Sequence, residues 1–345
     1  MIKAGIIGAT GYVGNELLRL LLRHPSVEVS GLRDVDSYEG KGYDSVYANY
    51  AEICNIKMTD QDTVIQNADV VFTCLPAGFS ERIAINCLES GKMLIDLGSD
   101  MRIRDEDVNK EWYGIDRQRQ DIIAQTVYSI PELHGQRLKS ARIIANPGCY
   151  PTTAALALAP AVEQGLVDTK TIIIDSKSGV TGAGKGPTAE TQYAEVNEAF
   201  RAYKIGQHRH IPEIEQILSD IAGSSVKVTF TPHLLPVNRG ILSTVYAGLS
   251  SDLSQDELWD VYNDFYKDKR FVRILPQGMA ANMKNVKYSN YCDISVHTDR
   301  RTGRLIVVSA IDNMVKGAAG QAIQNMNIAL GLEESMGLDL IPPTF

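Results

Sequence analysis

Residues 2–22 read IKAGIIGATGYVGNELLRLLL, and this stretch decides the fold class. The apolar run over residues 2–7 predicts a strand, and the leucines at positions 17, 18, 21 and 22 predict a helical face that ends at Pro25. Between them lie glycines at positions 8, 11 and 14. A strand, a glycine turn and a helix in this order predict nucleotide binding. The glycines let the backbone approach a pyrophosphate, and the helix N-terminus offers N–H donors.

The glycine spacing, GxxGxxG, departs from the common GxGxxG fingerprint, so a plain tight turn is the competing interpretation. The residues that follow the second expected strand, VEVSGL at 27–32, bear on cofactor choice. An arginine there would hold the 2′-phosphate of NADP, and an acid would hold the ribose hydroxyls of NAD. The chain offers both, Arg33 and Asp34, and we favour NADP through Arg33. No tyrosine has a lysine four residues later, which excludes the short-chain dehydrogenase pattern.

Strand and helix signals alternate up to about residue 150 and then change character. Expected strands at 68–76 and 92–99 flank a helix at 80–91, the pattern of a doubly wound parallel sheet. The later strands are long and β-branched, which predicts a mixed or antiparallel sheet. They lie at 170–179, 225–237, 241–249 and 304–312, with helices expected at 151–165, 254–268 and 317–332. The fold class is therefore α/β, a Rossmann-type sheet followed by an α+β domain.

Composition describes an ordinary globular protein, with 44% apolar and 22% charged residues. The formal charge of −8 and the absence of a basic patch argue against a nucleic-acid partner. No apolar run reaches the roughly 20 residues that a membrane helix needs. Five cysteines at irregular spacing, without a CxxC pair, predict thiols in a reducing cytoplasm and no metal site.

Residues 144–156, IANPGCYPTTAAL, place Cys149 between a Pro-Gly pair and an apolar helix. Most such cysteines are small buried hydrophobic residues. A thiol at a helix N-terminus, however, faces the positive end of the helix dipole, which lowers its pKa and makes it a nucleophile. The same N–H groups can stabilise an oxyanion on an attacked acyl carbon. The other four cysteines lack this setting, and two of them, Cys74 in an expected strand and Cys87 in an expected helix, are interpreted as core residues.

A nucleophilic cysteine needs an acid–base partner, and GQHRHIPEIEQ at 206–216 offers His208 and His210 at a helix entrance. A histidine there can also be a surface cap. The segment DSKSGVTGAGKG at 175–186 combines glycines, hydroxyl residues and two lysines after a strand. This composition favours an anion-cradling loop over a flexible hairpin.

Taken together, these segments resemble the N-acetyl-gamma-glutamyl-phosphate reductases of arginine biosynthesis along the whole chain. The matching segments are GATGYVGNELLRLL, NPGCYPTTAALALAP, SKSGVTGAGKG, FRAYKIGQHRHIPEIEQ, HLLPVNRGILSTVYA and KGAAGQAIQNMNIALGL. The sequences LPAG at 75–78 and LRDVDS at 32–37 depart from the family's usual Leu-Pro-His-Gly and Ser-Arg. The second departure lies at the ribose position and bears on the NADP preference.

The resemblance implies a Rossmann domain at 1–148, a glyceraldehyde-phosphate-dehydrogenase-like catalytic and dimerisation domain at 149–312, and a C-terminal helix at 313–345 that packs back on the first domain. It implies NADPH as reductant, a small acyl phosphate as substrate and a homo-oligomer. Cys149 becomes the acyl-accepting nucleophile and the two histidines the acid–base and orienting pair, with His208 slightly favoured as the proton donor. The implied cofactor-binding residues are Gly8, Thr10, Gly11, Tyr12, Val13, Gly14, Arg33, Ser178, Gly179, Asn313 and Gly317. The substrate-binding residues that we expect are Asn146, Ser178, Thr181, Lys185 and Arg239.

Three other interpretations stay open at this stage. An aspartate-semialdehyde dehydrogenase performs the same chemistry on a shorter substrate, but its usual Arg-Val-Pro-Val and Gly-His-Ser segments are absent here. An aminoadipyl-type reductase of lysine biosynthesis differs in acyl length. A redox-sensing regulator would use the nucleotide fold without turnover, and it gives no reason for a cysteine at a helix N-terminus together with a histidine segment.

Overall fold

The computed structural model describes residues 1–344 and divides the chain into two compact units. The first comprises Met1–Pro147 together with Ala318–Asp339, and the second comprises Gly148–Gly317 and the C-terminal residues from Leu340 onward. The sequence placed the corresponding breaks after residues 148 and 312.

Within the described residues, the first unit holds a six-stranded sheet in the order β2-β1-β3-β4-β6-β5, and every neighbouring pair is parallel. The strands are β1 (Ile2–Ile7), β2 (Val27–Arg33), β3 (Val70–Thr73), β4 (Met93–Asp96), β5 (Thr126–Tyr128) and β6 (Ile143–Ala145). The strand order reverses direction at β1, so the carboxyl end of β1 lies at a topological switch point, where doubly wound folds bind ligands. This confirms the predicted Rossmann-type sheet.

Helices connect these strands, as the alternating sequence pattern predicts. They are α1 (Tyr12–Leu21), α2 (Tyr43–Val46), α3 (Gln61–Asn67), α4 (Ser80–Glu89), α5 (Glu106–Tyr113), α6 (Gln120–Gln125), α7 (Pro131–His134) and α12 (Gly320–Ala329). Leu17, Leu18 and Leu21 of the predicted helical face are buried in α1, whereas Leu22 follows the helix and is exposed. Helix α12 comes from the end of the chain and contacts α1 and α7.

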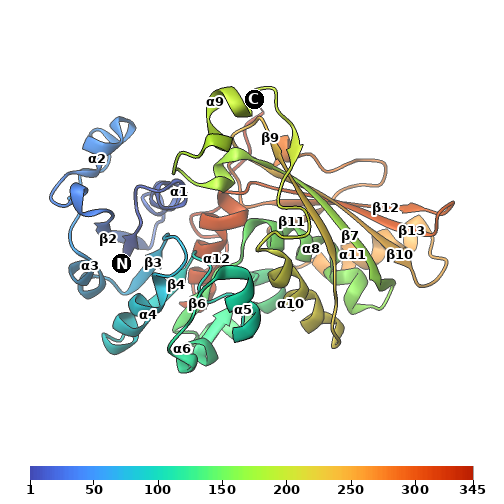
Figure 1. Cartoon of the computed structure of the whole chain (residues 1–345), viewed down its shortest axis with the longest axis horizontal. Helices are drawn as coiled ribbons and strands as arrows, with labels where there is room; N and C mark the ends of the chain where they lie inside the picture. The colour runs from blue at the N-terminus through green and yellow to red at the C-terminus, as the bar shows by residue number, and fades with distance from the viewer. Residues whose placement is uncertain (345) are drawn as a thin grey trace. The chain divides into compact units, whose positions relative to one another are not determined.

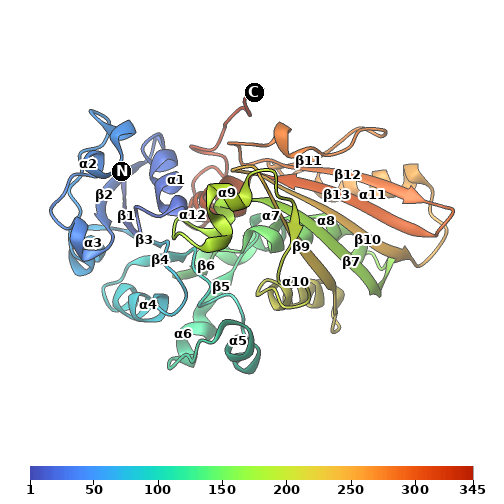
Figure 2. The ribbon, with the colours of Figure 1, turned by 45° about the horizontal axis from the view of Figure 1, so that its top comes forward.

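The second unit is built on a seven-stranded mixed sheet in the order β11-β12-β13-β10-β7-β9-β8. The strands are β7 (Val167–Gly179), β8 (Arg201–Ala202), β9 (Thr229–Leu235), β10 (Ile241–Leu249), β11 (Val272–Ile274), β12 (Cys292–Asp299) and β13 (Arg304–Ile311). The long strands β7, β10, β12 and β13 run side by side (Figures 1 and 2). Pairs β7–β9 and β11–β12 are parallel and the others antiparallel, which confirms the prediction of a mixed sheet.

One face of this sheet is covered by helices and the other is not. The helices of the unit are α8 (Cys149–Glu163), α9 (Tyr193–Val196), α10 (Ile211–Ala222) and α11 (Gln255–Tyr266). Helix α8 contacts β7, β10 and β13, while α10 packs on α8 and α11 packs on β11 and β12. Every residue of α8 from Tyr150 to Val162 is buried, so this apolar helix forms the centre of the core. Along β7, β10 and β13, the side chains on the opposite face of the sheet alternate with those under the helices and are partly exposed.

Several boundaries differ from the sequence expectation. Helix α1 begins at Tyr12, five residues before Leu17, the first leucine of the predicted face, and α8 begins at Cys149, two residues before the expected start at 151. A helix N-terminus needs backbone geometry rather than apolar side chains. The final helix follows one turn of π-helix at Val315–Ala319. Cys74 lies just after β3 and is partly exposed, so its assignment to a strand core is wrong.

Candidate active site

Cys149 is the first residue of α8. The preceding Gly148 has extended backbone (φ −71°, ψ 157°) and no side chain caps the helix. Thr152 closes the first turn, because both its backbone N (3.0 Å) and its Oγ1 (2.9 Å) donate to the Gly148 carbonyl. The thiol is partly exposed, whereas Cys54, Cys87 and Cys292 are buried. Burial raises the pKa of the Cys87 thiol to about 12. Cys149 therefore differs from those three in both position and exposure.

Gly317 makes room for this cysteine. A Cβ atom added at Gly317 would lie 2.8 Å from the Cβ of Cys149, closer than real side chains approach. The Gly317 N–H donates to the Asp312 carbonyl at 2.9 Å, which fixes the backbone at this contact. The sequence offered Gly317 as a cofactor-binding residue; the structure places it against Cys149, where only glycine fits.

The two predicted histidines lie together beside Tyr150, the neighbour of Cys149 in the chain. Their ring centroids are 4.9 Å apart, and they lie 5.4 Å (His208) and 5.9 Å (His210) from the ring of Tyr150. Both are buried, with 6% of their surface exposed. The structure thus brings His208 and His210 to the N-terminal end of α8, as a catalytic role requires.

His208 is held in one orientation. Its Nδ1 accepts a hydrogen bond from the His210 backbone N–H at 3.1 Å, and its Nε2 lies 3.5 Å from the hydroxyl of Tyr203. Desolvation by burial, followed by the charges of Arg209 and Lys204, lowers the pKa of His208 to about 3. At neutral pH this imidazole is therefore uncharged and acts as a fixed polar group.

Glu213 belongs to the same cluster, and the sequence analysis missed it. It lies in the first turn of α10, is 0% exposed, and its Oε1 accepts the Gly148 N–H at 2.7 Å. A buried carboxylate thus ties the helix that carries the histidines to the residue before Cys149. Its place three residues after His210 was the available signal, because that spacing puts both residues on one turn of a helix.

The segment 175–186 is ordered by backbone pairing. Strand β7 continues to Gly179, and a 3₁₀ turn at Val180–Ala183 follows. Thr181 Oγ1 donates to the Asn238 carbonyl at 2.6 Å and accepts from Asn313 Nδ2 at 3.0 Å, while Asn313 Oδ1 accepts the Gly240 N–H at 2.8 Å. The buried hydroxyl of Ser178 donates to the Gly179 carbonyl, and Lys185 is exposed. Ser178, Gly179, Thr181 and Asn313 therefore form one connected polar patch.

Arg239 and Asn146 have different surroundings. The guanidinium of Arg239 lies 4.6 Å from the ring centre of Tyr288, and its Nε lies 3.6 Å from Asp312 Oδ2. Asn146 belongs to the first unit, is fully buried, and its amide donates to the Ala318 carbonyl and accepts from Asn325. Asn146 thus has structural hydrogen bonds inside the first unit, whereas Arg239 lies in the same unit as Cys149.

The glycine turn of the first unit needs its glycines for two different reasons. Gly8 has φ +90°, and a Cβ atom added there would lie 2.5 Å from the Cys74 carbonyl oxygen. A Cβ atom added at Gly14 would lie 2.2 Å from the Gly8 carbonyl oxygen. At Gly11 an added Cβ would meet nothing closer than 3.5 Å. The protein itself does not require glycine at position 11, so the open space there fits the close approach of a cofactor phosphate.

Arg33 and Asp34 both have partners at the end of β2. Arg33 pairs with Asp36, and its Nη1 lies 3.6 Å from Glu39 Oε2. Asp34 Oδ2 accepts the Thr10 N–H at 2.7 Å and so joins the glycine turn to β2. A 2′-phosphate that binds Arg33 has to replace the carboxylate of Asp36.

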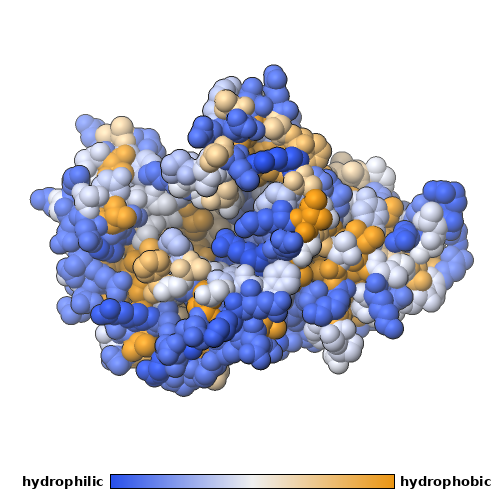
Figure 3. Space-filling view, viewed as in Figure 1, coloured by the Kyte–Doolittle hydropathy of each residue, from blue (hydrophilic) through white to orange (hydrophobic). Residues whose placement is uncertain are grey.

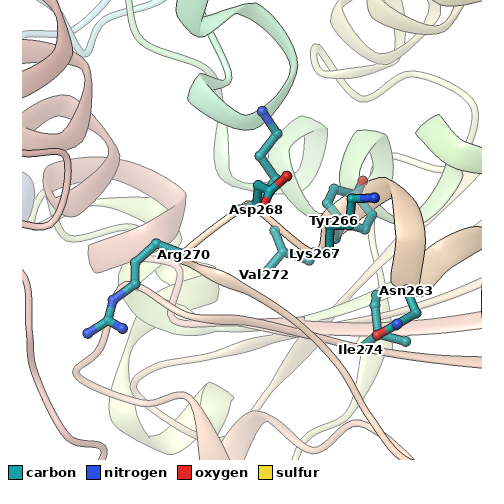
Figure 4. A pocket seen from close by; sticks show the side chains of 8 residues that line it. Asn263, Tyr266, Lys267, Asp268, Arg270, Val272 and Ile274 are labelled. Carbon is teal, nitrogen blue, oxygen red and sulfur yellow. The ribbon is translucent and has the colours of Figure 1, made fainter.

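One surface hollow of the second unit lies away from the cysteine–histidine cluster. It has a volume of about 470 Å³ and is lined by the end of α11 and by β11, including Lys267, Asp268 and Arg270 (Figure 4). Its lining shares no residue with the cysteine–histidine cluster. Within residues 1–344, no group of three or more His, Cys, Asp or Glu side chains could hold a metal ion, and no helix is long and apolar enough to cross a membrane.

Comparison with known proteins identifies both units. Residues 3–141 match the model of the semialdehyde dehydrogenase NAD-binding domain, and residues 149–313 match that of the semialdehyde dehydrogenase dimerisation domain. N-acetyl-gamma-glutamyl-phosphate reductases of Brachyspira hyodysenteriae and Clostridium botulinum are 52% and 50% identical, each over 100% of both chains. The reductase of Desulforudis audaxviator is 48% identical over 98% of both chains.

The chain belongs to the N-acetyl-gamma-glutamyl-phosphate reductase family. It is an oxidoreductase with a nicotinamide-cofactor-binding Rossmann domain, as predicted.

The fold is also that of the aspartate-semialdehyde dehydrogenases. Enzyme II of Vibrio cholerae, solved with ASA, superposes with a TM-score of 0.72 at 17% identity over 96% of this chain and 98% of that one. The Candida albicans aspartate-semialdehyde dehydrogenase, solved with NADP, superposes with a TM-score of 0.72 at 18% identity over 95% of this chain and 98% of that one. The reductase family thus shares its architecture with a sister family, and the full-length relatives favour the reductase over that alternative.

Proposed function

We propose that this chain catalyses the NADPH-dependent reductive dephosphorylation of N-acetyl-L-glutamyl 5-phosphate to N-acetyl-L-glutamate 5-semialdehyde, a step of arginine biosynthesis. One observation carries the proposal: a partly exposed cysteine begins an uncapped helix while two buried histidines lie against the adjacent Tyr150. This arrangement supplies a nucleophile, an anion-stabilising helix end and a proton carrier within one unit.

Cys149 performs the first step. Its thiolate, favoured by the helix N-terminus, attacks the acyl carbon of the substrate; the bond between that carbon and the phosphate oxygen breaks, and inorganic phosphate leaves. The acyl group is then a thioester on Cys149. The positive end of the α8 dipole lies at Cys149, so it can stabilise the oxyanion of the attacked carbonyl.

The first unit holds the cofactor through the residues around its glycine turn. The N–H groups of Tyr12, Val13 and Gly14 begin α1, which no side chain caps, and Gly11 leaves space for a phosphate. When bound, the nicotinamide supplies the hydride that reduces the thioester. Arg33, at the end of β2, is the residue that we propose to select NADPH.

When the reduced acyl group on Cys149 collapses to the aldehyde, its carbon–sulfur bond breaks, and a histidine donates a proton to the leaving thiolate, which restores the thiol. The sequence slightly favoured His208 for this role. Its pKa of about 3 argues otherwise, because an imidazole that is uncharged at neutral pH is a poor proton donor. We therefore assign proton transfer to His210 and orientation of the cluster to His208, whose ring is hydrogen-bonded to the His210 backbone and to the Tyr203 hydroxyl.

The substrate has a carboxylate and a phosphate that need polar partners. We propose Arg239 for the carboxylate, since guanidinium groups recognise carboxylates in two-point geometry. Ser178 and Thr181, with the exposed Lys185, are the proposed partners of the departing phosphate. Arg239, Ser178 and Thr181 all lie in the unit that contains Cys149.

A steady-state assay with purified protein and NADPH tests the reaction. N-acetyl-glutamyl phosphate should give the highest kcat/KM, well above aspartyl phosphate and the aminoadipyl analogue. The three compounds share the acyl phosphate and differ in the length and acylation of the chain, so the ranking measures specificity rather than reactivity. A higher kcat/KM for aspartyl phosphate would instead assign the chain to the sister activity.

We also propose that two copies assemble through the uncovered face of the seven-stranded sheet. This face carries a row of paired side chains across adjacent strands, with Tyr246 opposite both Ile173 and Ile306. Apolar patches are visible among polar ones over this unit (Figure 3), and the matching family model is that of a dimerisation domain. Tyr246→Arg should convert a dimer to a monomer in sedimentation experiments, whereas Tyr193→Arg, at an exposed position on α9, should not.

We further propose a cytoplasmic location. All five cysteines are thiols and none forms a disulfide. Thiols persist in a reducing compartment, and a nucleophilic cysteine requires one.

A further inference from the structure

Three tyrosines from one short segment donate hydrogen bonds around the glycine turn. The segment consists of α2, the linking residue Tyr47 and a 3₁₀ turn, η2 (Ala48–Tyr50). Tyr43 Oη donates to the Ala9 carbonyl at 2.9 Å, and Tyr47 Oη donates to the Thr10 carbonyl at 2.6 Å. Tyr50 Oη donates to the Asn15 carbonyl, inside α1, at 3.2 Å.

The three rings form a compact cluster. Their centroids lie 5.0 to 6.5 Å apart, and Tyr43 is 0% exposed. Asn15 Nδ2 donates to the Tyr43 hydroxyl at 2.9 Å and so fixes the direction in which that hydroxyl donates. Burial raises the pKa of Tyr43 strongly and that of Tyr50 to about 12, so both hydroxyls stay protonated donors.

These hydrogen bonds complete the pairing of the turn's backbone. The N–H groups of Gly8 and Ala9 donate to the Arg33 carbonyl, that of Thr10 to Asp34, and that of Gly11 to the Gly8 carbonyl. The carbonyls of Gly8 and Gly11 accept from the N–H groups of Gly11 and Asn15. The remaining carbonyls, those of Ala9 and Thr10, accept from Tyr43 and Tyr47.

Two peptide planes are therefore fixed at both ends. In the peptide between Ala9 and Thr10, the C=O accepts a hydrogen bond from Tyr43 and the N–H donates to Asp34. In the peptide between Thr10 and Gly11, the C=O accepts a hydrogen bond from Tyr47 and the N–H donates to the Gly8 carbonyl. A plane that rotated would turn a carbonyl dipole toward the space that a phosphate uses, which disfavours an anion.

We propose that Tyr43 and Tyr47 are positioning residues for the cofactor. Their hydroxyls hold the carbonyls of the glycine turn, so that only N–H donors at the start of α1 face a pyrophosphate. The turn is then organised before the cofactor binds, and binding costs less conformational entropy. This inference rests on the proposed role of the turn in cofactor binding.

Titration of the substrate-free protein with NADPH, followed by fluorescence, tests the proposal. Tyr47→Phe keeps the ring and removes only the hydroxyl, and because this residue is half-buried the variant should fold normally. Its Kd for NADPH should rise by about 5- to 100-fold, the range expected when one buried hydrogen bond is lost. Tyr43→Phe should behave in the same way. Tyr50→Phe is the matched control, since its hydroxyl bonds to a helix carbonyl outside the turn, and its Kd should stay within about threefold of the wild type.

Two further measurements separate positioning from general stability. In Tyr47→Phe, kcat at saturating NADPH and the KM for the acyl phosphate should be unchanged. Wild-type Kd values in both turn variants would overturn the proposal, as would an equal loss in Tyr50→Phe. If the wild-type protein itself fails to bind NADPH, the proposed function fails, and that result is distinguishable from failure of the tyrosine proposal.

Discussion

Helices α1 and α8 begin in the same way and serve different purposes. Each starts after a glycine with extended backbone, Gly11 at φ −69°, ψ 164° and Gly148 at φ −71°, ψ 157°, and neither helix is capped by a side chain. Each follows a parallel strand of the first sheet in the chain, β1 or β6. The same backbone arrangement thus presents two positive helix ends, one in each unit.

The difference lies in a few neighbouring groups. At α1 the Gly11 N–H donates to another carbonyl of the turn, and the open space at Gly11 leaves room for an external anion. At α8 the Gly148 N–H donates to the buried Glu213, and the first residue is a cysteine that can carry the negative charge itself. We propose that this similar backbone start binds an anion in one unit and favours a thiolate in the other, because the adjacent side chains differ.

The largest effect is expected where this difference is removed. Cys149→Ser should lower turnover by about 10⁴-fold or more, because a serine hydroxyl is hardly ionised at neutral pH and cannot form the thioester efficiently. The Kd for NADPH should stay at the wild-type value, since α1 is unchanged. Fluorescence titration and single-turnover assays measure the two quantities. Substantial residual turnover would show that the two helix ends do not differ in the way proposed.

The histidines are expected to give the next largest effect. His210→Asn should lower kcat by about 100- to 10,000-fold, the usual contribution of general acid–base catalysis. His208→Asn should act mainly through KM, as loss of an orienting contact does. Steady-state kinetics of both variants distinguish the roles. A kcat loss confined to His208→Asn would return the role of proton donor to His208, as the sequence favoured. Normal kinetics in both variants would show that neither histidine takes part in the reaction at Cys149.

Local sequence determined the two helix ends, and longer-range contacts determined what surrounds them. The glycine turn and Cys149 were predicted because backbone geometry and residue type coincide within a few positions. Glu213 was missed because its contact with Gly148 joins residues 65 apart in sequence. The eight-residue strand β12 was also missed. The short strands β5, β6 and β11 were missed too, since strands of three residues carry too little pattern to be recognised. The low pKa of His208 arises from tertiary burial, which no local pattern encodes.

The burial of His208 predicts a pH dependence of stability. Its pKa is lowered to about 3 from the ordinary 6.5, so the unfolded chain binds a proton between these values and the folded protein does not. The free energy of unfolding should therefore fall as the pH decreases from about 6.5 toward 3, by a few kcal/mol in all. Urea titrations at pH 7 and pH 4.5 should show a smaller difference for His208→Gln than for the wild type. An identical difference in both would mean that His208 is already protonated in the folded state.

At the α1 end, Arg33 is expected to set cofactor selectivity. Arg33→Ala should reduce the NADPH preference, measured as the ratio of Kd values for NADH and NADPH, by about 10- to 150-fold, the effect of losing a charge-assisted contact. Asp36→Asn should increase the preference by about two- to fivefold, because the 2′-phosphate no longer competes with an exposed carboxylate for the guanidinium. Unchanged ratios in both variants would show that selectivity resides elsewhere.

A further prediction concerns the open space at Gly11, the feature by which the start of α1 differs from the start of α8. Gly11→Ala meets no protein atom within 3.5 Å and requires no unusual φ, so the variant should unfold at the wild-type urea concentration. Its methyl group would lie where a pyrophosphate approaches, and the Kd for NADPH should rise by about tenfold, which corresponds to about 1.4 kcal/mol. Gly14→Ala is the contrasting variant, because its Cβ would lie 2.2 Å from the Gly8 carbonyl oxygen and the fold itself should be destabilised. If Gly11→Ala binds NADPH normally, the space at Gly11 does not receive the phosphate. The anion would then have to bind farther along α1, and the likeness between the two helix ends would extend only to their backbone.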